Sequence, residues 1–220
     1  MDPSKLRLDY FIRKDIPIYQ HTEHFHFNTD TKLLAEFMHV KKGDVFLDIG
    51  TNNGALLLYA DQFEVKKLIG VEVLQDSYEV AKYNAEKFIQ HDYEILHAPI
   101  QEVNLPLVDV IVSNPPFFTE NETHPNTLYD MRQLGRIEIN CDLDDLCKNA
   151  ARLLKSYGRF YFVHRPDRLQ EILVCLHTYH LSVKTLQFLY DQRTKSVKSV
   201  FIEAIKDSHC RCKVLPSVVI

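Results

Sequence analysis

Short apolar runs that end at a glycine or a polar residue recur along the chain. Such runs are typical of strands buried on both faces. The first five lie at residues 44–50, 66–72, 93–98, 107–114 and 158–165. Other segments carry apolar residues at helical spacing. The helices that we expect begin near Gly54 or span residues 74–91, 142–156 and 165–179. Strands that alternate with helices predict a doubly wound α/β fold with a mostly parallel sheet.

The ends of two expected helices carry residues with strong positional preferences. Asp142 suits the N-cap of the first helix, and Gly158 lies just past its expected end. Pro166 falls in the first turn of the following helix, where a missing N–H costs nothing.

The last two apolar segments, residues 182–190 and 196–206, are separated only by the sequence DQRTK. A parallel crossover needs a dozen or more residues, so this connection is too short for one. We expect these segments to form an antiparallel hairpin at one edge of the sheet.

The composition is that of an ordinary globular domain. The chain has 220 residues, of which 45% are hydrophobic and 25% charged. We expect one domain, with an N-terminal helical or cap segment (1–40), a Rossmann-like core (41–206) and a C-terminal tail (207–220). The first residues lack an apolar signal region, and no apolar run approaches the roughly 18–20 residues of a membrane span. The expectation is a cytoplasmic protein without a membrane partner.

Charge is unevenly distributed along the chain. Residues 1–110 carry 11 basic and 18 acidic side chains, whereas residues 146–220 carry 13 basic and 5 acidic ones. This polarity suggests a face that meets a polyanion, although dispersed solvated side chains explain it about equally well. The five cysteines show neither a disulfide framework nor a zinc motif, and reduced thiols are expected.

In doubly wound sheets, ligands bind beyond the carboxyl ends of the strands. The loops of interest therefore follow Ile49, Glu72, Ala98 and Ser113, all at one edge.

The sequence DIGTNNG, residues 48–54, places a carboxylate at the end of the first strand before a tight glycine turn. Gly50 allows close approach of a ligand, and Gly54 opens a helix whose N-terminus favours polar groups. Dinucleotide-binding proteins use similar turns, so this turn alone does not choose between a ligand site and a structural role. Glu72 ends the second strand, where a carboxylate can accept hydrogen bonds from a ribose diol. Together these residues favour an adenosine-containing ligand.

Asn114, Pro115, Pro116 and Phe117 form an NPPF motif directly after the fourth strand. The Asn114 side-chain oxygen and the Pro115 carbonyl could accept both hydrogens of an adenine amino group, which would make its nitrogen a better nucleophile. The prolines stiffen the loop, and Phe117, assisted by Phe118, offers a face for an extruded base. A Pro-Pro turn with two core aromatic rings is the alternative.

These motifs resemble those of class I S-adenosylmethionine-dependent methyltransferases, whose fold has a seven-stranded sheet. The resemblance implies a donor site with S-adenosylmethionine as cofactor and S-adenosylhomocysteine as product. Asn52 stands where the family usually has glycine, and Pro99 where many members have an aspartate against the adenine. The backbone amide of Ile100 could replace that contact. The implied donor-binding residues are Phe27, Asp30, Asp48, Gly50, Asn52, Gly54, Glu72, Val73, Ile100 and Asn114.

From about Ile18 to the C-terminus the chain resembles tRNA1(Val) adenine-37 N6-methyltransferases. The resemblance rests on FHFNTDTKLLAEF, VHRPDRLQEIL and VFIEAIK with the terminal VLPSVVI. It implies an adenine beside the anticodon as acceptor, and places Phe27 and Asp30 on a helix that closes over the donor. NPPF-type enzymes also modify guanine in ribosomal RNA, adenine in DNA and glutamine in proteins. Two alternatives come from other functional classes. One is a catalytically silent module that binds RNA or the donor, and the other is a nicotinamide-dependent oxidoreductase.

Several cations are candidates for contacts with tRNA phosphates, although each alone is more often a solvated surface charge. They are Arg132, Arg136, Arg165, Arg168, Arg193, Lys195 and Lys198, with Phe118 beside the base. The segment HTEHFH groups His21, His24 and His26 with Glu23, but its spacing matches no closed metal site, and no metal is expected. The sequence leaves open whether the protein is a monomer or a homodimer.

Overall fold

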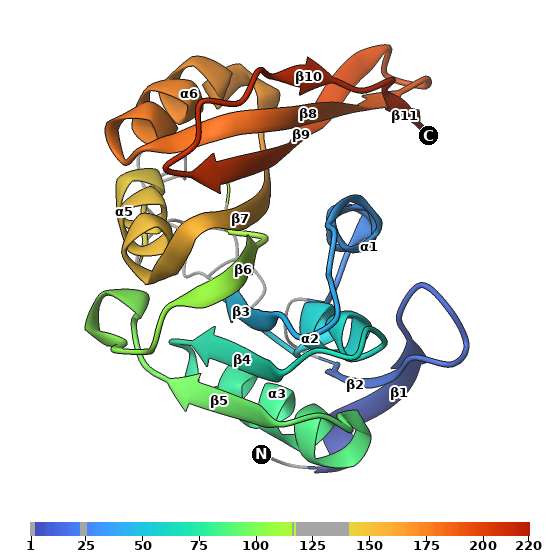
Figure 1. The fold of residues 1–220 in the computed structure, drawn as a ribbon. Coiled ribbons are helices and arrows are strands. Elements are labelled where there is room, and N and C mark those ends of the chain that lie inside the picture. The colour runs from blue at the N-terminus through green and yellow to red at the C-terminus, as the bar shows by residue number, and fades with distance from the viewer. Residues whose placement is uncertain (1–2, 23–25, 116, 118–140) are drawn as a thin grey trace, which may run out of the picture.

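A central sheet organises the chain in the computed structural model (Figure 1). The structure describes residues 3–22, 26–115, 117 and 141–220. Within these residues the sheet has nine strands in the order β10-β8-β9-β7-β6-β3-β4-β5, and β11 also pairs with β8. The strands are β3 (Val45–Ile49), β4 (Lys67–Glu72), β5 (Tyr93–His97), β6 (Val108–Ser113), β7 (Leu154–His164), β8 (Leu181–Asp191), β9 (Ser196–Lys206), β10 (Lys213–Val214) and β11 (Val218–Val219).

The pairing of these strands confirms the predicted fold class. Strands β5, β4, β3, β6 and β7 are parallel neighbours, and β9 is antiparallel to both β7 and β8. Order along the chain reverses between β3 and β6, and this point is where an open α/β sheet binds ligands. The seven longer strands form the expected core with its C-terminal hairpin.

Two apolar layers cover the sheet. One layer includes residues of α5 (Leu143–Leu153), α6 (Leu169–Thr178) and the short turn η2 (Ile100–Glu102). The opposite layer includes residues of α1 (Thr29–Phe37) and α2 (Ala55–Ala60), and α3 (Gln75–Phe88) contacts β4 and β5. Figure 1 shows α5 and α6 on one side of the sheet and α1 and α2 on the other. Among the described residues, no helix has both the length and the apolar character needed to cross a bilayer.

The segment before the core contains more than a helix. After the turn η1 (Pro3–Lys5), β1 (Leu6–Tyr10) and β2 (Pro17–His21) form an antiparallel hairpin ahead of α1. Asn84 of α3 holds this hairpin: its side-chain oxygen accepts from Tyr19 N at 2.7 Å, and its nitrogen donates to Tyr19 O and Asn53 O at 2.8 Å. The hairpin is therefore tied to the turn after β3.

The predicted boundary between the helix at residues 142–156 and the strand at residues 158–165 is wrong. Asp142 is the N-cap of α5 as expected, but the helix ends at Leu153, and β7 begins at Leu154. Leu154 is fully buried and pairs with Val108, so sheet pairing takes precedence over continuation of the helix. Gly158 lies inside β7, where a Cβ would come within 2.8 Å of Leu154 Cδ2 and Lys155 O.

Two further elements refine the sequence predictions. Pro166 opens the short turn η4 (Pro166–Arg168), which leads into α6. The tail beyond residue 206 is part of the sheet, because β10 and β11 pair with the outer side of β8. Two-residue strands are too short to produce a recognisable apolar pattern, and this is why the sequence did not predict them.

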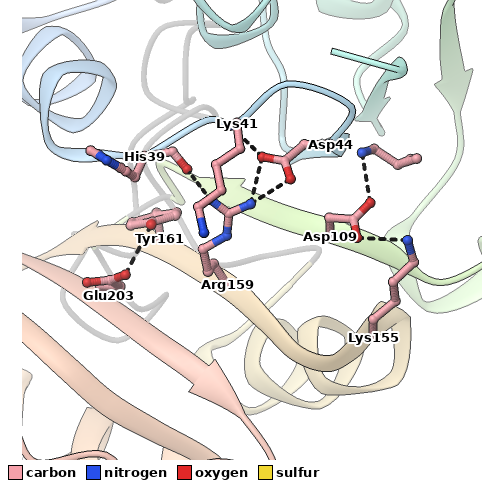
Figure 2. A network of polar contacts seen from close by, with 9 residues as sticks. His39, Lys41, Asp44, Asp109, Lys155, Arg159, Tyr161 and Glu203 are labelled. Carbon is pink, nitrogen blue, oxygen red and sulfur yellow. Dashed lines mark hydrogen bonds and ion pairs between the residues drawn. The ribbon is translucent and has the colours of Figure 1, made fainter. Parts of the chain in front are cut away.

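A polar network cross-links the amino ends of the parallel strands (Figure 2). The Arg159 guanidinium donates to both carboxylate oxygens of Asp44, at 2.6 and 2.7 Å, and to His39 O at 2.6 Å. Asp109 accepts from Val45 N at 2.9 Å and from the Lys155 ammonium at 2.7 Å. Burial by itself would raise the pKa of Asp109, but these hydrogen bonds lower it overall. The network lies at the edge opposite the candidate site and stabilises the sheet there.

Candidate active site

The turn after β3 is built from residues in left-handed backbone conformations. Gly50, Asn52 and Gly54 have φ values of 72°, 49° and 82°, and Gly54 is the N-cap of α2. Asparagine tolerates this region better than most residues, so Asn52 preserves the turn without a glycine. Gly50 N and Thr51 N both donate to Val71 O, at 2.9 and 3.0 Å, which holds the turn against β4.

Asp48 is a buried carboxyl with one unused oxygen. Its Oδ2 accepts from the Thr51 hydroxyl at 2.7 Å, whereas Oδ1 has no hydrogen-bond partner within the described part of the chain. Burial, with a smaller contribution from the charge of Glu72, raises the pKa of Asp48 to about 7. A buried acceptor without a donor is costly, and a ligand that donates N–H groups would satisfy it.

Glu72 ends β4 and holds the same turn from the other side. One carboxylate oxygen accepts from Asn52 N at 2.8 Å, and the other from Val73 N at 2.9 Å and Leu74 N at 3.0 Å. Burial raises the pKa of Glu72, against the opposing effect of these three donors. A carboxylate has about four acceptor sites, so Glu72 retains capacity for one ligand hydroxyl, at the oxygen that accepts only from Asn52 N.

Asn114 and Pro115 follow β6 directly beside the turn after β3. Ile49 pairs with Ser113 across the two parallel strands, and the Ser113 hydroxyl donates to Ile49 O at 2.8 Å. The residues that follow this pair are Gly50 and Asn114. The fold therefore places Asn114 and Pro115 beside the glycine turn.

The first turn of α1 also reaches this edge. The Asn114 side-chain nitrogen donates to the Thr31 hydroxyl at 2.9 Å. The neighbouring Asp30 accepts from the Ser199 hydroxyl of β9 at 2.6 Å, and burial raises its pKa. Thr31 was not among the candidates, although Asn28 and Thr31 have the spacing of a helix-capping pair.

Phe117 lies beside a second residue that the sequence did not single out. Its ring is 5.3 Å from that of His164, with a tilt of 42° between the planes. His164 is buried at the end of β7, and its Nδ1 accepts from Arg165 N at 2.8 Å. No sequence signal connects these two rings, because the sheet brings them together. The candidates Pro116, Phe118, Arg132 and Arg136 lie outside the described residues.

The remaining donor candidates have structural contacts. The Phe27 ring packs edge-on against Phe11, with centroids 5.1 Å apart, and Lys32 Nζ lies 5.1 Å above it. Phe27 precedes α1 rather than lying on it. Ile100 is buried in η2, and its carbonyl accepts from the Arg152 guanidinium at 3.1 Å.

The candidate RNA contacts fall into two groups. Arg165 pairs with Asp167, and Arg168 forms two bonds to Glu171, at 2.6 and 2.8 Å. The candidates on the β8–β9 hairpin are held less closely than Arg165 and Arg168. The Arg193 side chain is 88% exposed, and its Nε lies 3.8 Å from Asp191. His164 of β7 pairs with Val200 of β9, so the turn between β8 and β9 projects beyond the edge that carries the site. Lys195 and Lys198 are exposed on the same hairpin.

The histidine-rich segment is described only in part. His26 Nε2 lies 2.8 Å from His21 O, and Glu23 and His24 are outside the described residues. Within the residues that are described, no three histidine, cysteine, aspartate or glutamate side chains are grouped as metal ligands.

A protein-family model described as methyltransferase small domain matches residues 22–186. This match, with the strand order and the turn after β3, makes the protein a class I methyltransferase that uses S-adenosylmethionine. The match covers more than half of the chain, and the protein belongs to the methyltransferase small domain family.

Two curated relatives share a name. A tRNA1(Val) (adenine(37)-N6)-methyltransferase of Phocaeicola vulgatus is 28% identical over 207 residues, covering 92% of this chain and 86% of the relative. One of Tolumonas auensis is 32% identical over 160 residues, covering 68% and 63%.

Solved structures show the same fold at lower identity. The M. jannaschii tRNA m1G37 methyltransferase superposes with a TM-score of 0.70 at 11% identity, covering 94% of this chain and 58% of that one. A predicted O-methyltransferase of Agrobacterium tumefaciens gives 0.64 at 17% identity, covering 85% of each chain.

The residues present fit the methyl donor. Asp48 Oδ1, which has no donor among the described residues, can accept from the amine of the methionine portion, and Glu72 can accept from a ribose hydroxyl. The left-handed backbone at Gly50 leaves open space where a side chain would otherwise stand.

Proposed function

We propose that the protein transfers a methyl group from S-adenosylmethionine to N6 of an adenine in the anticodon loop of tRNA, at position 37 of a valine tRNA. The observation that carries the proposal is the pairing of Ile49 with Ser113, because it sets the donor turn beside Asn114. The names of the relatives, at 28% and 32% identity, support the choice of base and RNA.

Bound S-adenosylmethionine supplies an electrophilic methyl group on a positively charged sulfur. Asp48 would accept from the amine of the donor and Glu72 from its ribose, and the open space at Gly50 would leave room for it. Asn114 Oδ1 and the Pro115 carbonyl accept the two hydrogens of the adenine amino group, so that its lone pair is directed at the methyl carbon. Transfer would form an N–C bond as the C–S bond of the donor breaks, and the amino proton would pass to water.

Phe117 provides a face on which the extruded adenine stacks. Its contact with His164 keeps the ring beside β7. The hairpin turn carrying Arg193 and Lys195 contacts the tRNA backbone, because exposed cations at the same edge are suited to phosphates. This substrate would place the protein in the cytoplasm.

The test is an incubation with labelled S-adenosylmethionine and separate pools of tRNA, ribosomal RNA, DNA and protein, followed by digestion to nucleosides or amino acids. Label is expected in N6-methyladenosine from tRNA. A valine tRNA transcript should accept the methyl group, and the same transcript with guanine at position 37 should not. Label confined to protein, DNA or N2-methylguanosine would overturn the substrate assignment. Donor binding by calorimetry with no transfer to any pool would indicate a silent binding module.

A further inference from the structure

The first helical turn of α1 is built around a single hydroxyl that also contacts the candidate catalytic amide. Thr31 is buried, and its Oγ1 lies 3.0 Å from Asn28 Oδ1, 3.3 Å from Asn28 N and 2.9 Å from Asn114 Nδ2. Thr31 N donates to Asn28 Oδ1 at 2.9 Å, which completes a capping box. Thr31 and Asn114 are 83 positions apart in the sequence.

Donors and acceptors in this cluster can be assigned without ambiguity because two of them are backbone N–H groups, which only donate. Thr31 N–H faces the Asn28 side chain, so the Asn28 atom opposite it is the oxygen. The Thr31 hydroxyl lies against that same oxygen and directs its one proton there. Both lone pairs of Oγ1 are then used, one by Asn28 N and one by Asn114.

The orientation of the Asn114 amide follows from this assignment. A hydroxyl that has already donated its proton can only accept, and only the NH₂ end of the amide can face it. Turning the amide around would set two acceptor oxygens 2.9 Å apart or withdraw the proton from Asn28. The amide is planar, so Oδ1 is directed away from the Thr31 hydroxyl.

We infer that Thr31 is a positioning residue, which holds the Asn114 carboxamide so that its oxygen faces the amino group of the acceptor base. This inference rests on the proposed function of Asn114. The helix cap needs only Asn28 and Thr31, and the contact with Asn114 adds nothing to it. The contact instead joins the first turn of α1 to the residue that follows β6.

The experiment compares Thr31→Val, which replaces the hydroxyl by a methyl group, with Thr31→Ser, which keeps it. At saturating donor and tRNA, Thr31→Val should lower kcat by about tenfold, since one buried hydrogen bond is worth up to about that factor. Thr31→Ser should restore most of the rate. The KM for both substrates should stay within about twofold, because the amide acts in the transition state.

A control variant tests whether a threonine-to-valine change by itself slows the enzyme. Thr178 lies at the end of α6, where its hydroxyl donates only to Val174 O within its own helix, at 3.0 Å. Thr178→Val makes the same chemical change away from the site, and its kcat should equal that of the unaltered protein. A rate loss in both variants would assign the effect of Thr31→Val to general destabilisation and overturn the inference.

Two further measurements distinguish failure of the inference from failure of the proposed function. Turnover that survives in Asn114→Ala would remove the proposed role of Asn114, whereas loss in Asn114→Ala with full activity in Thr31→Val would remove only that of Thr31. Hydrogen exchange of the Asn114 side-chain amide, followed by NMR, does not depend on the substrate. Exchange should be several-fold faster in Thr31→Val than in Thr31→Ser, and equal rates would overturn the inference.

Discussion

At the scale of single residues, the site depends on where unused hydrogen-bonding capacity remains. Glu72 has most of its acceptor capacity taken by three backbone donors, and Asn114 donates one hydrogen of its NH₂ group to Thr31. Asp48 differs because one of its buried oxygens has no donor in the described residues. The same burial that holds these groups in place makes an ionised Asp48 unfavourable until a donor group arrives.

Donor affinity should therefore depend on the ionisation of Asp48. The carboxyl has its pKa raised to about 7 in the free protein, and only the ionised form accepts fully from an amine. Below that pKa, binding must release a proton, so affinity falls as pH falls. We expect the Kd for S-adenosylmethionine, measured by calorimetry, to be about eightfold higher at about pH 6 than at about pH 7.5, where the amine of the donor is still mainly protonated.

The control is Asp48→Asn, which should bind more weakly and lose this pH dependence.

The raised pKa of Asp48 also affects the stability of the free protein. Between the usual pKa of 3.8 and about 7, the folded chain keeps a proton that the unfolded chain has lost. This carboxyl therefore lowers stability as pH rises through that interval, and Asp48→Asn should remove that contribution. An unchanged pH profile in Asp48→Asn would assign the titration to another group.

At the scale of elements, side chains of α2 and of the turn after β3 pack closely over Gly70 of β4. A Cβ at Gly70 would lie 2.8 Å from Leu57 Cδ1, 3.0 Å from Thr51 Cγ2 and 3.1 Å from Ile95 Cδ1. Leu57 belongs to α2, and Thr51 carries the hydroxyl that donates to Asp48. The absence of a side chain at Gly70 is thus part of the donor site.

Gly70→Ala should push α2 and Thr51 away from the sheet. Overpacking of this kind costs about 1–3 kcal/mol of stability, which urea unfolding would measure. Donor affinity should also fall, because Thr51 moves relative to Asp48. The comparison is Gly43→Ala, where a Cβ meets nothing within 4 Å but φ is 81°. That variant should lose about 1–2 kcal/mol through backbone strain and bind the donor normally.

At the scale of the whole molecule, the buried ion pair and the candidate site lie at opposite edges of the sheet. The buried pair of Arg159 and Asp44 lies at the amino edge, with side chains only 10% and 9% exposed. The glycine turn, Asn114 and the hairpin turn lie at the carboxyl edge. Polar groups at the two edges can therefore be changed separately.

Arg159→Leu should destabilise the fold without slowing the folded enzyme. Removing one partner of a buried pair leaves an uncompensated charge, which costs about 3–5 kcal/mol. The double variant with Asp44→Leu should recover part of this loss, measured by urea unfolding. The exposed pair of Lys42 and Glu64 is the control, with side chains 79% and 71% exposed, and Lys42→Ala should leave stability unchanged. Equal effects of the two changes would contradict the structural role of the buried pair.

The hairpin turn is the second test at this scale. Replacing both Arg193 and Lys195 by serine should weaken binding of the proposed tRNA substrate and reduce the slope of log K against log salt by about 1–2. Binding of S-adenosylmethionine should not change. Arg13→Ser with Lys14→Ser removes the same charge from the exposed turn between β1 and β2 and should leave tRNA affinity nearly unchanged. If both pairs weakened binding equally, net charge rather than the hairpin would be responsible.

The sequence by itself determined the alternation of strands and helices in the core, from β3 to β9, and the edge at which their loops meet. These features follow from local periodicity, as in β3 and β6, and from turn residues such as Gly50 and Gly54. The acidic residue at Glu72 and the NPPF motif could also be found without coordinates, since each stands directly after an apolar run.

Only the tertiary structure decided which distant residues touch. The contacts of Thr31 with Asn114, Phe117 with His164 and Asp30 with Ser199 join segments that no periodic pattern relates. The same holds for the boundary at Leu154 and for the short strands of the tail, which depend on a neighbouring strand for their pairing. Local pattern reflects forces within a few residues, whereas these contacts depend on how whole elements are placed against one another.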